Sequence, residues 1–234
     1  MKLNKFVPIT LLAGTLMLAS CGSKEPRESS ENNSDTDISD ITSDKGGSGS
    51  SDVTPVEPVY TITEAEFSAL KSKLSNPKIF LEGNFTVDLS AGVFSSKNKL
   101  ANGKVDCYIQ TEHFMFDFDV DSYNATTQKA NGDTYYYDDS DGTWSKETGE
   151  IDVAKYASLC FQFEDVFYYA PSFESFTYDE ETRQYSGSKT IDDQTVVTNF
   201  KVKDGQFLSY GVVGFVTYTF SDYGTTTVTL PTVA

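Results

Sequence analysis

The chain has 234 residues, of which 38% are hydrophobic, and it carries a formal net charge of −17. So strong a negative charge repels nucleic acid and anionic lipid head groups, and we expect neither as a partner. A leader and a linker take about a quarter of the length, which leaves one domain of ordinary size.

The first 20 residues have the organisation of a secretory signal peptide. Lys2 and Lys5 precede an apolar run over residues 6–19. A membrane-spanning helix needs roughly 20 apolar residues, so this run is too short to be one. A basic start, a short apolar middle and small residues before the cleavage point are instead typical of the leader of an exported protein.

The leader ends in Leu18-Ala19-Ser20-Cys21, which resembles the lipobox of bacterial lipoproteins. The resemblance implies that Cys21 carries at least a diacylglyceryl group and becomes the N-terminus of the mature chain. Two or more acyl chains hold a protein stably at a membrane. We therefore expect an extracytoplasmic protein that is lipid-anchored to the bacterial cell membrane through Cys21. Loss of Lys2 and Lys5 with the leader makes its net charge −17 − 2 = −19.

Residues 21–57 are predicted to be the lipidated cysteine and a linker rich in Ser, Gly and Asp. Such a composition offers too little apolar surface to offset the entropy of the chain, so we expect it to be disordered. Gly46-Gly47-Ser48-Gly49-Ser50 is typical of a flexible linker, and the segment has a root-mean-square reach of about 30–35 Å. The folded domain is expected over residues 58–234.

A helix is predicted at the start of this domain. Thr63 and Glu66 have the spacing of a capping box, and Ile62 and Phe67 have that of a hydrophobic staple. Asn76-Pro77 then ends the helix. We expect its apolar face to pack on the sheet that follows.

Alternation of apolar and polar residues predicts a series of strands after this helix. The first covers residues 79–89, and further strands cover residues 105–109 and 114–120. Tyr135-Tyr136-Tyr137 leads through a turn with Gly142 into Thr143-Trp144, which predicts a β-hairpin. More strands follow over residues 176–178, 185–189, 196–202, 206–213 and 216–220.

A helical insert over residues 152–170 interrupts the strands. Its apolar residues recur at steps of three and four, and Pro171 ends it. The insert is rich in aromatic residues on more than one side. A helix that is apolar nearly all round is typically buried, so this segment needs apolar surroundings.

This order predicts an α+β, β-dominated domain. We expect a curved open antiparallel sheet, a half-barrel, packed on the N-terminal helix and the mid-chain insert. Its most distinctive pieces are Val202-Lys203-Asp204-Gly205-Gln206 and Phe220-Ser221-Asp222-Tyr223-Gly224. With the lipobox, they resemble the bacterial half-barrel lipoproteins, which include the outer-membrane lipoprotein carrier and the mycobacterial lipid-binding lipoproteins. The resemblance implies that the space between sheet and helices receives acyl chains.

No catalytic residue, metal site or cofactor is predicted. His113 is the single histidine, and it has no cysteine or second histidine near it in the sequence. This argues against a zinc site and against a nucleophilic triad. The chain also lacks a phosphate-binding glycine loop and a dinucleotide fingerprint. We therefore expect a protein that is not an enzyme.

Two cysteines remain after Cys21. Cys107 and Cys160 can form a disulfide if the domain is exported. Both positions also suit a small, buried apolar residue. Both alternatives stay open at the level of the sequence.

The aromatic residues carry the remaining signal. A pocket for an apolar ligand is concave and mostly aromatic or aliphatic. Strand alternation suggests such a pocket, and its candidate lining residues are Phe116, Phe118, Phe200, Tyr218 and Phe220. We expect a monomer that binds or carries a lipid or another hydrophobic ligand. The alternative is a solid surface module that binds a protein or a component of the cell envelope, since the same aromatic residues can fill a core.

Overall fold

The computed structural model describes residues 57–161 and 163–233. The signal peptide, Cys21 and the predicted linker up to residue 56 lie outside the described residues. In the described part, eleven strands form one antiparallel sheet in the order β6-β5-β4-β3-β2-β1-β11-β10-β9-β8-β7. β6 and β7 are its two edges, so the sheet is open. The prediction of a β-dominated domain with an open antiparallel sheet is confirmed.

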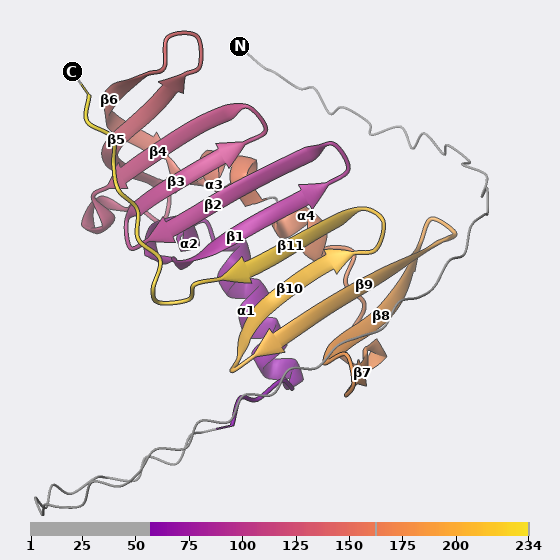
Figure 1. The fold of residues 1–234 in the computed structure, drawn as a ribbon. Helices are drawn as coiled ribbons and strands as arrows, with labels where there is room; N and C mark the ends of the chain where they lie inside the picture. The colour runs from indigo at the N-terminus through magenta and orange to yellow at the C-terminus, as the bar shows by residue number, and fades with distance from the viewer. Residues whose placement is uncertain (1–56, 162, 234) are drawn as a thin grey trace, which may run out of the picture. The chain divides into compact units, whose positions relative to one another are not determined.

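The sheet consists of two meanders that meet in its centre (Figure 1). The first meander contains β1 (Asn84–Ala91), β2 (Phe94–Ala101), β3 (Lys104–Ile109), β4 (Glu112–Phe118), β5 (Lys129–Asp138) and β6 (Thr143–Asp152). The second contains β7 (Thr177–Asp179), β8 (Gln184–Ile191), β9 (Gln194–Lys203), β10 (Gln206–Val212) and β11 (Val216–Ser221). β1 pairs with β11, so the first and last strands along the chain join the two halves.

The helices of the described residues lie on one face of this sheet, behind it in Figure 1. They are α1 (Glu64–Ser75), α2 (Ile79–Glu82), α3 (Val153–Phe161) and α4 (Phe163–Phe167), with short 3-10 turns η1 (Val120–Ser122) and η2 (Phe173–Ser175). The core lies between the sheet and these helices. No helix in the described part of the chain is long and apolar enough to cross a membrane.

α1 begins with the predicted capping box. Glu66 N donates to Thr63 Oγ1 at 3.3 Å, and Thr63 N donates to Glu66 Oε2 at 2.8 Å. The backbone and hydroxyl bonds from Thr63 hold the pKa of Glu66 below its usual value. Two orphan amides at the start of the helix are thereby satisfied.

The predicted strand over residues 79–89 is wrong in its first part. Ile79–Glu82 is the short helix α2, and β1 begins only at Asn84. A strand would expose every second residue, whereas Ile79, Phe80 and Leu81 are all buried. A single helical turn buries the three together because it packs between α1, α3 and the sheet.

β2 was absent from the predicted strands. Its inward positions include Ser96 and Asn98, which are as buried as neighbouring apolar residues. The alternation of polar and apolar residues that marks other strands is therefore missing here. Pairing with β1 and β3 on both sides nevertheless makes this segment a central strand.

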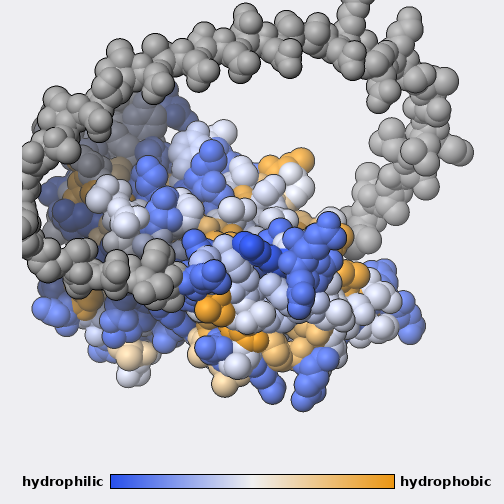
Figure 2. Space-filling model, turned by 60° about the horizontal axis from the view of Figure 1, so that its bottom comes forward, coloured by the Kyte–Doolittle hydropathy of each residue, from blue (hydrophilic) through white to orange (hydrophobic). Residues whose placement is uncertain are grey.

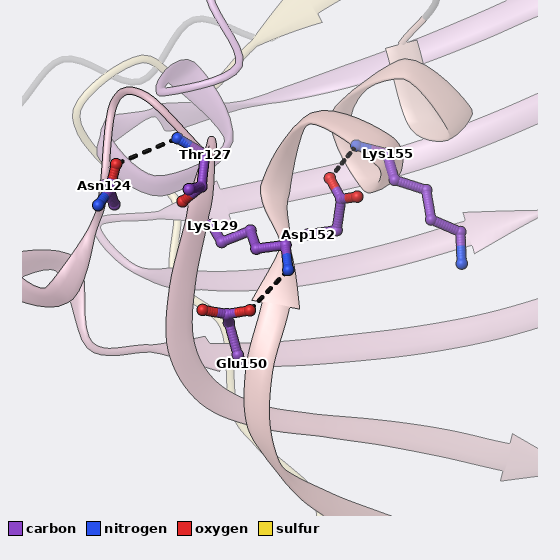
Figure 3. Close-up of polar contacts among 6 residues, drawn as sticks. All are labelled: Asn124, Thr127, Lys129, Glu150, Asp152 and Lys155. Atoms are coloured by element: carbon purple, nitrogen blue, oxygen red, sulfur yellow. Dashed lines mark hydrogen bonds and ion pairs between the residues drawn. The ribbon is translucent and has the colours of Figure 1, made fainter.

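A helical insert was predicted over residues 152–170, and α3 and α4 both lie within this range. It follows β6 directly, and Asp152 Oδ1 caps its start by accepting a bond from Lys155 N at 2.9 Å (Figure 3). Beside this cap, Lys129 of β5 and Glu150 of β6 form an exposed ion pair at 2.6 Å. The local turn from strand to helix is therefore stabilised by side chains near it in the sequence.

The surface away from the core is mixed in polarity. Figure 2 shows hydrophobic patches between larger hydrophilic areas on the side that it presents. Along β11 the burial alternates strictly, and Thr217, Thr219 and Ser221 are exposed. Alternation of this kind is typical of an antiparallel sheet with one face on the core and the other in water.

Candidate functional site

The five predicted lining residues all lie on the helix-covered face of the sheet. Phe116 and Phe118 belong to β4, Phe200 belongs to β9, and Tyr218 and Phe220 belong to β11. Each is at most 6% exposed. The alternation in the sequence therefore assigned them to the correct face.

Each of these five side chains contacts an aromatic ring from a helix. Phe200 stacks on Phe67 of α1, with ring centroids 4.8 Å apart. Phe163 of α4 lies 4.9 Å from the ring of Tyr218 and 5.9 Å from that of Phe220.

The β4 residues pack in the same way against the other helices. The ring of Phe80 in α2 lies 5.5 Å from Phe116 and 5.8 Å from Phe118. Tyr156 of α3 lies 4.7 Å from Phe116. Aromatic pairs at such distances stabilise a core beyond the area that they bury. The five residues thus form part of a continuous aromatic layer between sheet and helices.

Polar side chains of the sheet hold the end of α3. Ser96 Oγ and Asn98 Nδ2 donate to the carbonyl oxygen of Cys160 at 3.0 and 3.4 Å. Tyr218 OH donates to the carbonyl oxygen of Phe161 at 2.5 Å. Buried carbonyl oxygens need hydrogen-bond donors, and side chains of the sheet supply them here. These bonds attach the last residues of α3 to β2 and β11.

The two remaining cysteines meet at the same place. Cys107 of β3 and Cys160 of α3 are joined as a disulfide, with Cα atoms 6.9 Å apart. Both side chains are buried. The link adds a covalent attachment of the insert to the sheet, next to the hydrogen bonds from Ser96 and Asn98.

A pocket of about 390 Å³ lies at another place, between α1, α2 and one end of the sheet. Its wall is formed by residues of α1, α2, β1, the turn between β9 and β10, β10 itself, and the segment after β11. These residues are Leu70, Lys73, Leu74, Ile79, Glu82, Gly83, Asn84, Phe85, Asp204, Gly205, Gln206, Phe207, Tyr223 and Gly224. None of the five predicted lining residues is among them.

The pocket combines an apolar wall with a polar rim. Leu74, Phe85 and Phe207 are buried and present apolar surface, while Lys73 and Asp204 carry opposite charges. Tyr223 OH donates to the carbonyl oxygen of Phe207 at 2.8 Å. Burial raises the pKa of the Tyr223 phenol well above its usual value, so it remains protonated and keeps this bond. Such a wall and rim suit an amphiphilic molecule.

The segment that precedes α1 is hydrogen-bonded to the sheet beside this pocket. Val59 N donates to Asp204 Oδ1 at 2.9 Å, and Asp204 N donates to the carbonyl oxygen of Val59 at 2.7 Å. Ile62 N donates to Tyr185 OH at 3.0 Å. Residues just before α1 are therefore fastened to the β9–β10 turn and to β8.

Protein-family models, curated proteins and solved structures give no match to the chain.

Sequence reasoning found only part of the pocket. It marked the segments with Asp204-Gly205 and with Tyr223 as distinctive, and it predicted that the apolar face of the first helix packs on the sheet. It assigned Ile79 to a strand, so the meeting of α1 with α2 was missed. Pairing of β1 with β11, which brings these distant segments together, has no local signal.

His113 lies on the opposite face of the sheet, outside this pocket. Its Nε2 atom is 2.7 Å from Asp106 Oδ1, and its ring lies 4.7 Å from that of Trp144. Tyr108 and Tyr137 complete this aromatic cluster. Among the described residues, no three His, Cys, Asp or Glu side chains are arranged to bind a metal ion.

Proposed function

We propose that the chain is a non-catalytic, membrane-anchored extracytoplasmic lipoprotein that binds or carries a lipid or another hydrophobic ligand. The pocket between α1, α2 and the sheet is the observation that carries this proposal. Its volume of about 390 Å³ falls within the ordinary range for small-molecule sites. The ligand's apolar part packs against Leu70, Leu74 and Phe207, and its polar end lies at the rim with Lys73 and Asp204.

The arrangement of the domain supports the family resemblance behind this proposal. A half-barrel carrier has an open sheet with helices on one face, and the acyl chain lies between them. This chain has an open antiparallel sheet, and aromatic residues of four helices cover one of its faces. We further propose that the sheet is curved around these helices as in the half-barrel lipoproteins.

Titration with a fluorescent fatty-acyl probe tests the proposal. The mature chain, residues 21–234 with Cys21→Ser, is expected to bind the probe saturably. Leu70→Trp places a larger ring at the half-buried wall of the pocket and is expected to weaken binding at least tenfold. Tyr108→Trp makes a matched change on the opposite face and is expected to leave binding unchanged.

The packed aromatic layer favours a second candidate, a solid surface module. All five residues first expected to line a cavity contact helix rings instead. If the wild-type chain shows no saturable probe binding while its unfolding transition is normal, the carrier proposal is wrong and this candidate stands. Equal weakening by Leu70→Trp and Tyr108→Trp also contradicts the assignment of the pocket.

A further inference from the structure

Two neighbouring hairpins end in apolar residues. The β1–β2 turn carries Val93, which is 97% exposed, and the β10–β11 turn carries Val213 and Phe215, which are 60% and 43% exposed. We call these three side chains the apolar tips. Other hairpins of the sheet turn through polar residues, namely Asn102-Gly103, Asp192-Asp193 and Asp204-Gly205.

The apolar tips lie at the same end of the sheet. β1 and β11 are antiparallel neighbours, and Ser90 at the end of β1 pairs with Thr217 near the start of β11. The turn that follows β1 is therefore beside the turn that precedes β11, at the right-hand end of the sheet in Figure 1. Adjacent strands are only about 4.8 Å apart, so the two turns form one projecting edge.

The start of the connection after α4 extends this edge. Tyr168 is 61% exposed, and the ring of the adjoining Tyr169 lies 5.9 Å from Phe215. Lys189 Nζ donates to the carbonyl oxygen of Tyr168 at 2.9 Å and lies over its ring. Three separate parts of the chain thus contribute apolar or aromatic side chains to one end of the domain.

Turn chemistry does not explain these residues. Exposed turns favour Gly, Asn, Asp, Ser and Pro because of their backbone conformations and local hydrogen bonds. Gly92 and Gly214 supply the positive φ angles that these two turns need, so the flanking valines and phenylalanine are not required for the turn itself. Exposed apolar residues that a turn does not need are expected at functional sites, and here they lie together at one end of the fold.

We propose that the apolar tips insert into the interfacial region of a neutral lipid bilayer. Apolar side chains that enter the boundary between head groups and acyl chains bind a membrane in proportion to the apolar area that they bury. Tyr168 and Lys189 suit the level of the head groups, since an aromatic ring with a polar end and a long basic side chain are both favoured there. This inference rests on the proposed membrane anchor for its setting.

The anchor makes a weak contact of this kind effective. Tethering converts the second contact into an intramolecular one and raises its effective concentration. Val59 is fastened to Asp204, at the opposite end of β10 from Val213, which is about 30 Å away at about 3.3 Å per residue. The reach of about 30–35 Å that the sequence predicts for the linker is long enough for the tips to meet the same membrane.

Flotation with vesicles of pure phosphatidylcholine tests the proposal without the anchor. The chain used is residues 21–234 with Cys21→Ser, which has no lipid of its own. Val93→Ser, Val213→Ser and Phe215→Ser together are expected to weaken vesicle binding at least tenfold with no change in charge. Tyr108→Ser with Tyr137→Ser removes exposed rings from the opposite face and is expected to leave binding unchanged.

A fluorescence variant keeps the test decisive if the triple variant folds poorly. Trp144 is the single tryptophan. Val93→Trp in a Trp144→Phe background therefore carries one indole, at the tip of the β1–β2 turn. With vesicles, the emission of this indole is expected to shift to shorter wavelength and to be quenched by brominated lipid. Anionic vesicles are expected to bind more weakly, because the mature chain carries a large negative charge.

Three results overturn the inference. They are no flotation of the wild-type chain with neutral vesicles, equal loss of binding in the tip and control variants, and no quenching of the introduced indole in the Val93→Trp variant. The acyl-probe titration is independent of these measurements. Failure of vesicle binding with a functional pocket removes only the membrane contact, whereas failure of the probe alone removes only the carrier function.

Discussion

Three polar residues on the buried face of the sheet have a definite structural task. Ser96, Asn98 and Tyr218 donate to the carbonyl oxygens of Cys160 and Phe161 in α3. A buried carbonyl without a partner costs free energy comparable with a lost hydrogen bond. These residues therefore make it possible to bury the backbone of Cys160 and Phe161 against the sheet.

Removing one of these donors is expected to destabilise the domain. Tyr218→Phe keeps the ring in its contacts with Phe163 and deletes the hydroxyl that bonds to Phe161 O. We expect the free energy of unfolding to fall by about 1–3 kcal/mol, because a buried acceptor loses its donor. Urea denaturation followed by circular dichroism measures this change.

Tyr108→Phe is the matched control, since Tyr108 is exposed on the opposite face. Its effect is expected to stay within about 0.5 kcal/mol. Equal stabilities of wild type and Tyr218→Phe contradict the role of the hydroxyl.

At the scale of elements, the insert is attached to the sheet mainly around the end of α3. The pair Cys107 and Cys160 lies there, beside the bonds from Ser96 and Asn98. Asp152 fixes the other end of α3, where the insert leaves β6. α3 is thus held at both ends, and its aromatic residues are presented to β4.

The disulfide between Cys107 and Cys160 is the prediction at this scale. Alkylation of the unreduced, unfolded protein is expected to find no free thiol. The two cysteines are 53 residues apart, for which the chain-entropy estimate of stabilisation is about 4 kcal/mol. Cys107→Ala with Cys160→Ala is therefore expected to lower the midpoint of urea unfolding.

Reductant supplies the control for this prediction. It is expected to destabilise the wild type and to leave the double variant unchanged. Two labelled thiols in the unreduced wild type show that the cysteines act instead as small buried residues, the other alternative that the sequence allowed.

At the scale of the whole molecule, the first and the last strand along the chain meet in the centre of the sheet. β1 and β11 pair there, and Asn84 Oδ1 accepts a further bond from Thr226 N at 2.9 Å. The pocket lies at this junction. Formation of the pocket therefore depends on β11 and the segment after it. A chain truncated before β11 lacks this part of the pocket wall.

The proposed anchor belongs to this scale as well. Cys21→Ser removes the lipidated side chain, and the protein is expected to move from the membrane fraction to the soluble exported fraction. Fractionation of cells followed by immunoblotting measures the shift. The apolar tips provide only a weak contact, so the variant is expected to leave the membrane on washing. Persistent association of Cys21→Ser after washing contradicts the lipid anchor.

Local chemistry determined much of this protein from the sequence. Thr63 and Glu66 marked the start of α1 because a capping box uses only neighbouring atoms. Strict alternation placed Phe116, Tyr218 and Phe220 on the inner face, since side chains of a strand alternate whatever the strand pairs with.

Tertiary structure alone decided the remainder. Ile79, Phe80 and Leu81 form a helical turn because three elements surround them, which overrides their strand-like pattern. β2 is a strand because its neighbours pair with it, and Ser96 and Asn98 are buried because α3 packs over them. Whether the aromatic face was hollow or filled also depended on partners distant in the sequence. The pocket opened at α1 and β1 because burial and pairing are settled by contacts across the chain, which no local pattern contains.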